Sequence, residues 1–157
     1  MLNDFELSIL PVVWRSGLAA LIGLVIGWER HASGSPVRAR ILALVAMTAT
    51  ALTAIGIQMS LGDLSRILAG LLSGVGFIGA GVLMGNDKGE VRGLTTAAAL
   101  WATTGVSIVI GLGYVVLGLL LALMVYLVIS WDDWPVFARL RQRRAQQIAK
   151  DEAREND

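Results

Sequence analysis

Residues 93–131 read GLTTAAALWATTGVSIVIGLGYVVLGLLLALMVYLVISW, a run of 39 residues without a charge between Arg92 and Asp132. A helix that crosses a bilayer needs roughly 20 such residues, so this run is long enough for two crossings. Gly111, Leu112 and Gly113 stand near its middle and supply a break, because glycine readily leaves the helical conformation. The run therefore predicts a pair of membrane-spanning helices.

Charges divide the preceding part of the chain into similar lengths. Arg40 and Asp63 enclose 22 uncharged residues, and Arg66 and Asp87 enclose 20. The composition agrees, since 55% of the 157 residues are hydrophobic and only 16% are charged, whereas soluble domains carry a more polar surface. We therefore predict an all-α, polytopic transmembrane bundle of about five spans, at residues 8–28, 41–57, 67–84, 94–111 and 114–130.

The distribution of basic residues predicts the orientation of the bundle. With the N-terminus outside, 11 of the 13 bases fall on the cytoplasmic side and only Arg15 and Arg66 remain outside. That asymmetry follows the positive-inside rule. Residues 1–131 are predicted to form the transmembrane domain, and residues 132–157 a short charged helix in the cytoplasm. Because Arg15 interrupts the first segment, a re-entrant path for that segment stays open.

The third predicted span is rich in glycine, and its glycines lie on two faces of a helix. Small residues four apart allow membrane helices to pack closely, so one interpretation is a central packing helix. The other is a helix that breaks at its glycines and lines a polar cavity. The glycines are Gly70, Gly74, Gly81 and Gly85 on one stripe, and Gly76 and Gly79 on the opposite side.

Residues 74–79 also match the G-x-G-x-x-G pattern of dinucleotide-binding turns. The pattern has that meaning only after a strand and with an acidic residue about 20 positions further on, and neither condition holds inside an apolar span. We therefore expect no bound cofactor. The absence of cysteine also excludes thiolate chemistry, and the sequence leaves the question of a metal open.

The fourth predicted span carries a stripe of hydroxyl groups at Thr96, Thr103 and Ser107, with Thr95 and Thr104 beside it. Hydroxyls in membrane helices usually donate to the carbonyl four residues earlier or to a neighbouring helix. The functional alternative is a polar lining for an ion or solute path.

Ionisable residues near membrane spans are costly and therefore informative. At the cytoplasmic ends, Glu29 and Arg30 are expected to face the loop that contains Arg92, as interfacial ion pairs or as a gate or docking surface. On the outer side, Arg15 lies within an apolar segment and needs a partner or a snorkelling route to the membrane surface. The nearest counter-ion expected from the topology is Asp63.

Three segments give the chain a family resemblance. They are residues 21–30, which end in Gly27-Trp28-Glu29-Arg30, residues 65–81, and residues 91–98 followed by Trp101. In order and spacing they resemble the MgtC/SapB family of bacterial inner-membrane proteins, which also includes the YhiD proteins. By this resemblance the positions that matter are Glu29, Arg30, Arg66, Gly76, Phe77, Gly79, Gly81, Arg92, Gly93, Thr95, Thr96 and Trp101.

The resemblance implies a multi-pass protein of the bacterial cytoplasmic membrane that is associated with growth in low magnesium. It further implies modulation of other membrane machines, the proton-translocating ATP synthase among them. Two features depart from the family. Residues 34–40 read GSPVRAR where the family usually has a Gly-Leu-Arg-Thr-like sequence, and many members continue into a soluble C-terminal domain that is not expected here.

Three functional hypotheses follow. The first is a non-enzymatic membrane modulator or scaffold, built as a homo-oligomer with a dimer favoured, embedded in lipid and without nucleic-acid partners. The second is a small homo-oligomeric transporter or channel that uses Glu29, Arg92, Thr95 and Thr96. The third, an intramembrane enzyme, is disfavoured because the chain has a single histidine and lacks the H-E-x-x-H and G-x-S-x-G patterns.

Overall fold

The computed structural model of the chain describes residues 2–32, 39–58, 63–83 and 93–133. This part of the chain is helical and contains no strand, which confirms the predicted fold class. Five α-helices are followed by a short 3₁₀ helix: α1 (Leu2–Ala32), α2 (Ala39–Gln58), α3 (Leu64–Leu83), α4 (Leu94–Gly111), α5 (Val115–Ile129) and η1 (Ser130–Asp133).

Four of the helices are long and apolar enough to cross a membrane, namely α2, α3, α4 and the part of α1 from Ile9 to Ala32. Helix α1 is continuous and extends beyond the predicted limits of 8–28 at both ends. Helix α5 has 15 residues, about 22 Å at 1.5 Å per residue, which is less than the roughly 30 Å of a hydrocarbon core. The fifth predicted span is therefore an apolar helix of less than full crossing length.

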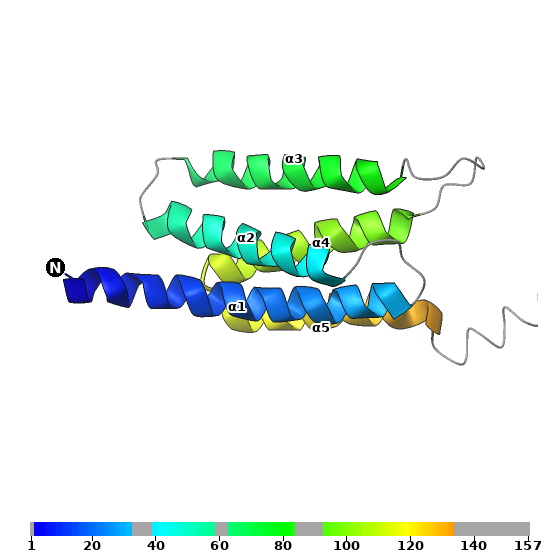
Figure 1. Cartoon of the computed structure of the whole chain (residues 1–157), viewed down its shortest axis with the longest axis horizontal. Coiled ribbons are helices and arrows are strands. Elements are labelled where there is room, and N and C mark those ends of the chain that lie inside the picture. Colours follow the sequence, from blue (N-terminus) through cyan, green and yellow to red (C-terminus); the bar gives the residue numbers. More distant parts are fainter. Residues whose placement is uncertain (1, 33–38, 59–62, 84–92, 134–157) are drawn as a thin grey trace, which may run out of the picture.

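The helices run in alternating directions and form a bundle with two distinct ends (Figure 1). At one end, called here the N-terminal end, lie the start of α1, the end of α2, the start of α3 and the turn between α4 and α5. At the other, called the Arg30 end, lie the ends of α1, α3 and α5 and the starts of α2 and α4.

The turn between α4 and α5 is formed by three residues, Leu112, Gly113 and Tyr114. Gly113 has φ +101°, in the left-handed region that side chains other than glycine rarely adopt. The predicted break inside the long apolar run is thus confirmed, and its cause is the conformational freedom of this glycine.

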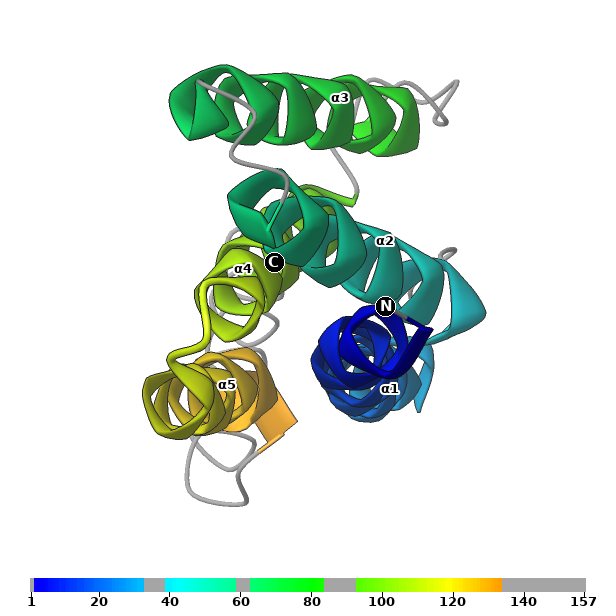
Figure 2. The same ribbon diagram turned by 90° about the vertical axis from the view of Figure 1, so that its left-hand side faces the viewer.

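The core lies among α1, α2, α4 and α5, whereas α3 covers one edge of the bundle (Figure 2). Buried side chains of α1, α2 and α4, such as Ile26, Leu42 and Leu100, pack together there. Within α3 only Val75 and Gly79 are buried. Helix α3 is continuous and therefore does not break at its glycines. Because it lies at the edge of the bundle, it is also not the central packing helix of the other interpretation.

The closest helix packing occurs between α1 and α2. A Cβ added at Gly23 would lie 2.6 Å from the carbonyl oxygen of Leu42, and one added at Gly27 would lie 2.5 Å from the Cα of Ala39. No real Cβ tolerates such distances to a backbone. The two glycines therefore allow the backbones of α1 and α2 to touch, as small residues four apart do in membranes.

Candidate functional site

Four of the predicted polar site residues lie at the Arg30 end of the bundle: Glu29 and Arg30 in the last turn of α1, and Thr95 and Thr96 in the first turn of α4. Arg30 is only 7% exposed, and its Nη2 donates a hydrogen bond of 3.2 Å to the carbonyl oxygen of Ile129. Ile129 is the last residue of α5, where helix carbonyls lack partners and cations are favoured. Arg30 thereby joins α1 to α5.

The two threonines at the start of α4 differ in environment. Thr96 is buried, whereas Thr95 is exposed and lines a groove of about 290 Å³ between α4 and α5. The helix begins after Gly93, whose φ of +90° and close approach to Val82 of α3 require glycine. Arg92, predicted to pair with Glu29, lies outside the described residues.

Arg66 lies at the N-terminal end of the bundle, so the structure does not bring it together with the other predicted polar residues. Its side chain is 86% exposed, and its Nε lies 3.5 Å from Oδ2 of Asp63. Asp63 thus pairs with Arg66, and not with Arg15 as the topology suggested.

Asp63 also caps the start of α3. Its Oδ1 accepts hydrogen bonds from the hydroxyl of Ser65 and from the backbone N–H of Arg66, the latter at 3.2 Å. These bonds, chiefly that from Ser65, lower the pKa of the Asp63 carboxyl below its ordinary value of 3.8. The polar residues here form a helix cap, whose local role is to satisfy amides of the first turn.

Most glycines of α3 contact no other helix of the described chain. A Cβ added at Gly70, Gly74, Gly76 or Gly81 would have no described atom within 4 Å outside its own helix, whereas one at Gly79 would meet the Cβ of Ala97 at 3.5 Å. Two aromatic residues from the predicted packing set are also outward-facing: Phe77 is 83% exposed and Trp101 is 56% exposed. Gly85 lies outside the described residues.

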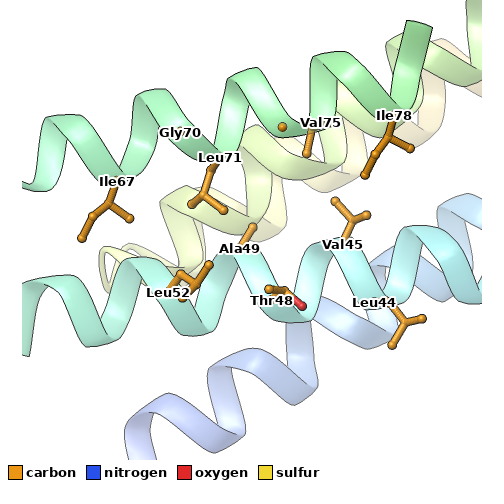
Figure 3. A pocket seen from close by; sticks show the side chains of 11 residues that line it. Leu44, Val45, Thr48, Ala49, Leu52, Ile67, Gly70, Leu71, Val75 and Ile78 are labelled. Carbon is orange, nitrogen blue, oxygen red and sulfur yellow. The ribbon is translucent and has the colours of Figure 1, made fainter. Parts of the chain in front are cut away.

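A groove of about 560 Å³ separates α3 from α2 over much of their length (Figure 3). The side chains of Ile67, Leu71 and Ile78 point from α3 toward α2, and Gly70 and Gly74 add no side chain of their own. The lining on α2 consists of Leu44, Val45, Thr48, Ala49 and Leu52. Because Thr48 is the one polar side chain in this lining, the groove suits an apolar helix or chain.

Hydroxyl groups occupy the buried interface between α2 and α4. Thr50 of α2 donates to the carbonyl of Ser107 at 2.9 Å, across the interface. Thr104 and Ser107 donate to the carbonyls four residues earlier, at 2.8 and 2.7 Å. The expectation of backbone-bonded hydroxyls is confirmed for these two residues of the fourth span.

Sequence reasoning missed the contribution of α2 to this interface and the glycines of α1. The buried hydroxyls of Thr50 and Thr53 stand three residues apart and share one face of a helix. Gly23 and Gly27 show the four-residue spacing of small residues that signals close helix packing. Both patterns can be seen in the sequence, but the packing prediction was based on the denser glycine pattern of the third span.

Comparison of the sequence with known proteins identifies a family that the chain matches. The sequence model of the MgtC family matches residues 17–134, which includes all of α2, α3, α4 and α5. Solved structures offer no significant match.

Individual relatives agree with the family match. Protein MgtC of Salmonella typhimurium is 39% identical over 103 residues, which are 66% of this chain and 44% of that protein. Protein SapB of Bacillus subtilis is 33% identical over 112 residues, 66% of this chain and 48% of its own length. An uncharacterized protein of Haemophilus influenzae is 34% identical over 139 residues, 82% of this chain and 58% of its own length.

The chain spans about half the length of these curated relatives. Together, the match over most of the chain, the five apolar helices and the relatives agree on a multi-pass membrane protein. The chain belongs to the MgtC family.

Proposed function

We propose that this chain is a non-enzymatic protein of the bacterial cytoplasmic membrane that works by binding other membrane-spanning helices. Its first partner is a second copy of itself, in a homodimer, and its further targets are membrane machines such as the ATP synthase. The setting is magnesium limitation or a related stress, as the resemblance to the MgtC/SapB family implies. No chemical step is required of the chain in this role.

The observation that carries the proposal is the open groove between α2 and α3. Apolar side chains line it, and Gly70 and Gly74, about one turn apart, leave the backbone of α3 accessible. In lipid, helices associate mainly through close van der Waals packing, which small residues permit. A helix laid in this groove would gain such packing along its length. Lipid chains alone would fill the groove less regularly.

A large exposed apolar side chain on α3 supports the same role. Phe77, which does not line the groove, is 83% exposed. The hydroxyls of Thr104 and Ser107 are bonded to carbonyls of their own helix, which supports a packing role for α4.

The test is Gly74→Leu, which places a large side chain in the groove. Its matched control is Gly17→Leu on α1, because Gly17 is also exposed and has nothing within 4 Å of an added Cβ among the described residues. We expect native mass spectrometry of the full chain in nanodiscs to show a dimer for the wild type and for Gly17→Leu. For Gly74→Leu the ratio of dimer to monomer should fall at least tenfold, whereas the thermal unfolding of the monomer should be unchanged.

A dimer that survives Gly74→Leu at wild-type strength would contradict the groove as the binding surface. The physiological part of the proposal is tested separately. A strain that lacks the protein should grow poorly in low magnesium, and the wild type and Gly17→Leu should restore growth while Gly74→Leu should not. Equal growth with and without the protein would contradict the link to magnesium.

A further inference from the structure

Arg15 is a cation inside the apolar length of α1, within the part of that helix able to cross a membrane. Its Nε atom is buried and has no hydrogen-bond partner among the described residues. The described interaction of its guanidinium is with the ring of Trp14, whose centroid lies 5.8 Å from Cζ. An arginine at such a place is costly in lipid and is retained where it has a partner or a task.

The guanidinium of Arg15 lies beside the turn between α4 and α5. A Cβ added at Gly113 would lie 3.5 Å from Nη1 and 3.6 Å from Nη2 of Arg15. Glycine at this position, with its φ of +101°, therefore keeps the space in front of both terminal nitrogens free of a side chain from the turn. The four N–H groups of Nη1 and Nη2 therefore lie at this turn.

The turn between α4 and α5 does not reach as far along the bundle axis as the start of α1 and the end of α2 do (Figure 1). Gly111 packs against Thr50 and Thr53, whereas α2 continues to Gln58 and meets Ile67 of α3 at Gly56. The five residue steps from Thr53 to Gln58 correspond to about 7 Å of helix. Headgroups and water can therefore approach Arg15 from this end, over the turn between α4 and α5.

The acidic residue expected to neutralise Arg15 is engaged elsewhere. Asp63 pairs with Arg66 and caps α3. A guanidinium is more weakly hydrated than an ammonium group, and its planar fork matches two oxygens of a phosphate. Tryptophan next to it is typical of the headgroup layer of a membrane.

We propose that Arg15 is the anion-binding residue of a phosphate site at the turn between α4 and α5. The ligand is a phosphate group, carried by a phospholipid of that leaflet or free in solution. Nη1 and Nη2 donate to two phosphate oxygens, and the glycine at position 113 leaves room for them. The site lies on the α1, α4 and α5 side of the bundle, so it is independent of the groove between α2 and α3.

The test uses the full chain in mild detergent with two probes, phosphatidylglycerol and inorganic phosphate. Native mass spectrometry measures retention of the lipid, and thermal unfolding measures protection by phosphate. The variants are Arg15→Gln and Arg15→Lys. The matched control is Arg66→Gln, because Arg66 is also a cation at the N-terminal end but is exposed and paired.

We expect Arg15→Gln to lower the apparent affinity for phosphatidylglycerol at least tenfold. Arg15→Lys should lower it about threefold, because a lysine keeps the charge but loses the fork, and Arg66→Gln should leave it within twofold of wild type. A loss of the lipid alone would identify a headgroup site. A loss of phosphate protection alone would identify a site for the free anion.

Equal binding of both probes by the wild type and Arg15→Gln would overturn the proposal. So would an equal loss in Arg66→Gln, because that result would reflect net charge alone. If Arg15→Gln fails to fold, Arg15→Lys decides the matter, and wild-type affinity in that variant would overturn the assignment.

Discussion

Helices α1 and α3 each carry glycines four residues apart in an apolar sequence, yet the two pairs meet different surroundings. An added Cβ at Gly23 or Gly27 would lie within 2.6 Å of the backbone of α2, whereas at Gly70 or Gly74 it would meet no described atom within 4 Å beyond its own helix. The same spacing thus builds an internal contact in one helix and an open face in the other. Small-residue spacing indicates that a helix can be approached closely, and the tertiary structure decides by which partner.

The largest effect on stability is expected at Gly23 and Gly27, the glycines of α1 that contact the backbone of α2. Gly27→Ala places a Cβ 2.5 Å from the Cα of Ala39, and two backbones would have to separate to accommodate it. Overpacking of this kind should lower the free energy of unfolding by about 3 kcal/mol. Its control, Gly74→Ala, should change that free energy by less than about 0.5 kcal/mol, because the new methyl group enters open space.

Unfolding in mixed micelles, followed by tryptophan fluorescence, measures both variants. Equal stability of Gly27→Ala and Gly74→Ala would refute the contrast between α1 and α3.

The next effect concerns the connection that leads from α3 into α4. Gly93→Ala forces a side chain into a backbone with φ +90° and toward Cγ1 of Val82 at 2.9 Å. We expect a loss of about 1–2 kcal/mol in the free energy of unfolding. Gly105→Ala in the middle of α4 is the control, since nothing lies within 4 Å of its added Cβ among the described residues. The same micelle titration compares them, and equal losses would contradict a special backbone at Gly93.

A smaller effect on stability is expected at the buried interface between α2 and α4. Thr50→Val removes the hydrogen bond to the carbonyl of Ser107 on α4, and such bonds between membrane helices average about 0.6 kcal/mol. Thr53→Val removes a bond to Ala49 within the same helix and should cost less. Unfolding free energies of the two variants give the comparison. A larger loss in Thr53→Val would show that the contact between α2 and α4 does not depend on this bond.

The smallest effect is local to the start of α3. The folded-state pKa of Asp63 is lowered from 3.8, so its stabilising contribution is present above that pH and is lost as the pH falls through the lowered value. Asp63→Ala should speed hydrogen exchange in the first turn of α3 at neutral pH and remove its acid dependence. Ser65→Ala should weaken the effect partly, because that hydroxyl is the main cause of the shift. If the hydrogen-exchange rate of Asp63→Ala in the first turn of α3 equals that of the wild type, Asp63 does not stabilise the start of the helix as a cap.

Much of the fold was predictable because it follows from local physics. The break at Gly113 came from a glycine in the middle of a run too long for one helix, and the spans came from the distances between charges. The fate of the hydroxyls at Thr104 and Ser107 was also predictable, since their acceptors lie one turn away in the same helix. Each of these features depends on residues close together in the sequence.

The candidate site was harder to predict because it depends on contacts between distant residues. The family resemblance names Arg66 together with Glu29 and Arg30, whereas the distribution of bases assigns it to the opposite side of the membrane, and the structure places it at the other end of the bundle. Asp63 was expected near Arg15 but forms its cap and ion pair with residues two and three positions away, because such bonds need no long chain closure. Arg30 found its carbonyl partner on α5, 99 residues along the chain.

The sequence by itself determined that this is a helical membrane protein and approximately where each helix begins and ends. It did so because a bilayer imposes a length of roughly 20 apolar residues and rejects charges between the ends. Only the tertiary structure decided that α1 and α2 close on their glycines, that α3 keeps its glycines open beside a groove, and that Arg15 faces a turn. Apolar residues face both lipid and protein in a membrane, so hydrophobicity cannot distinguish a covered face from an exposed one.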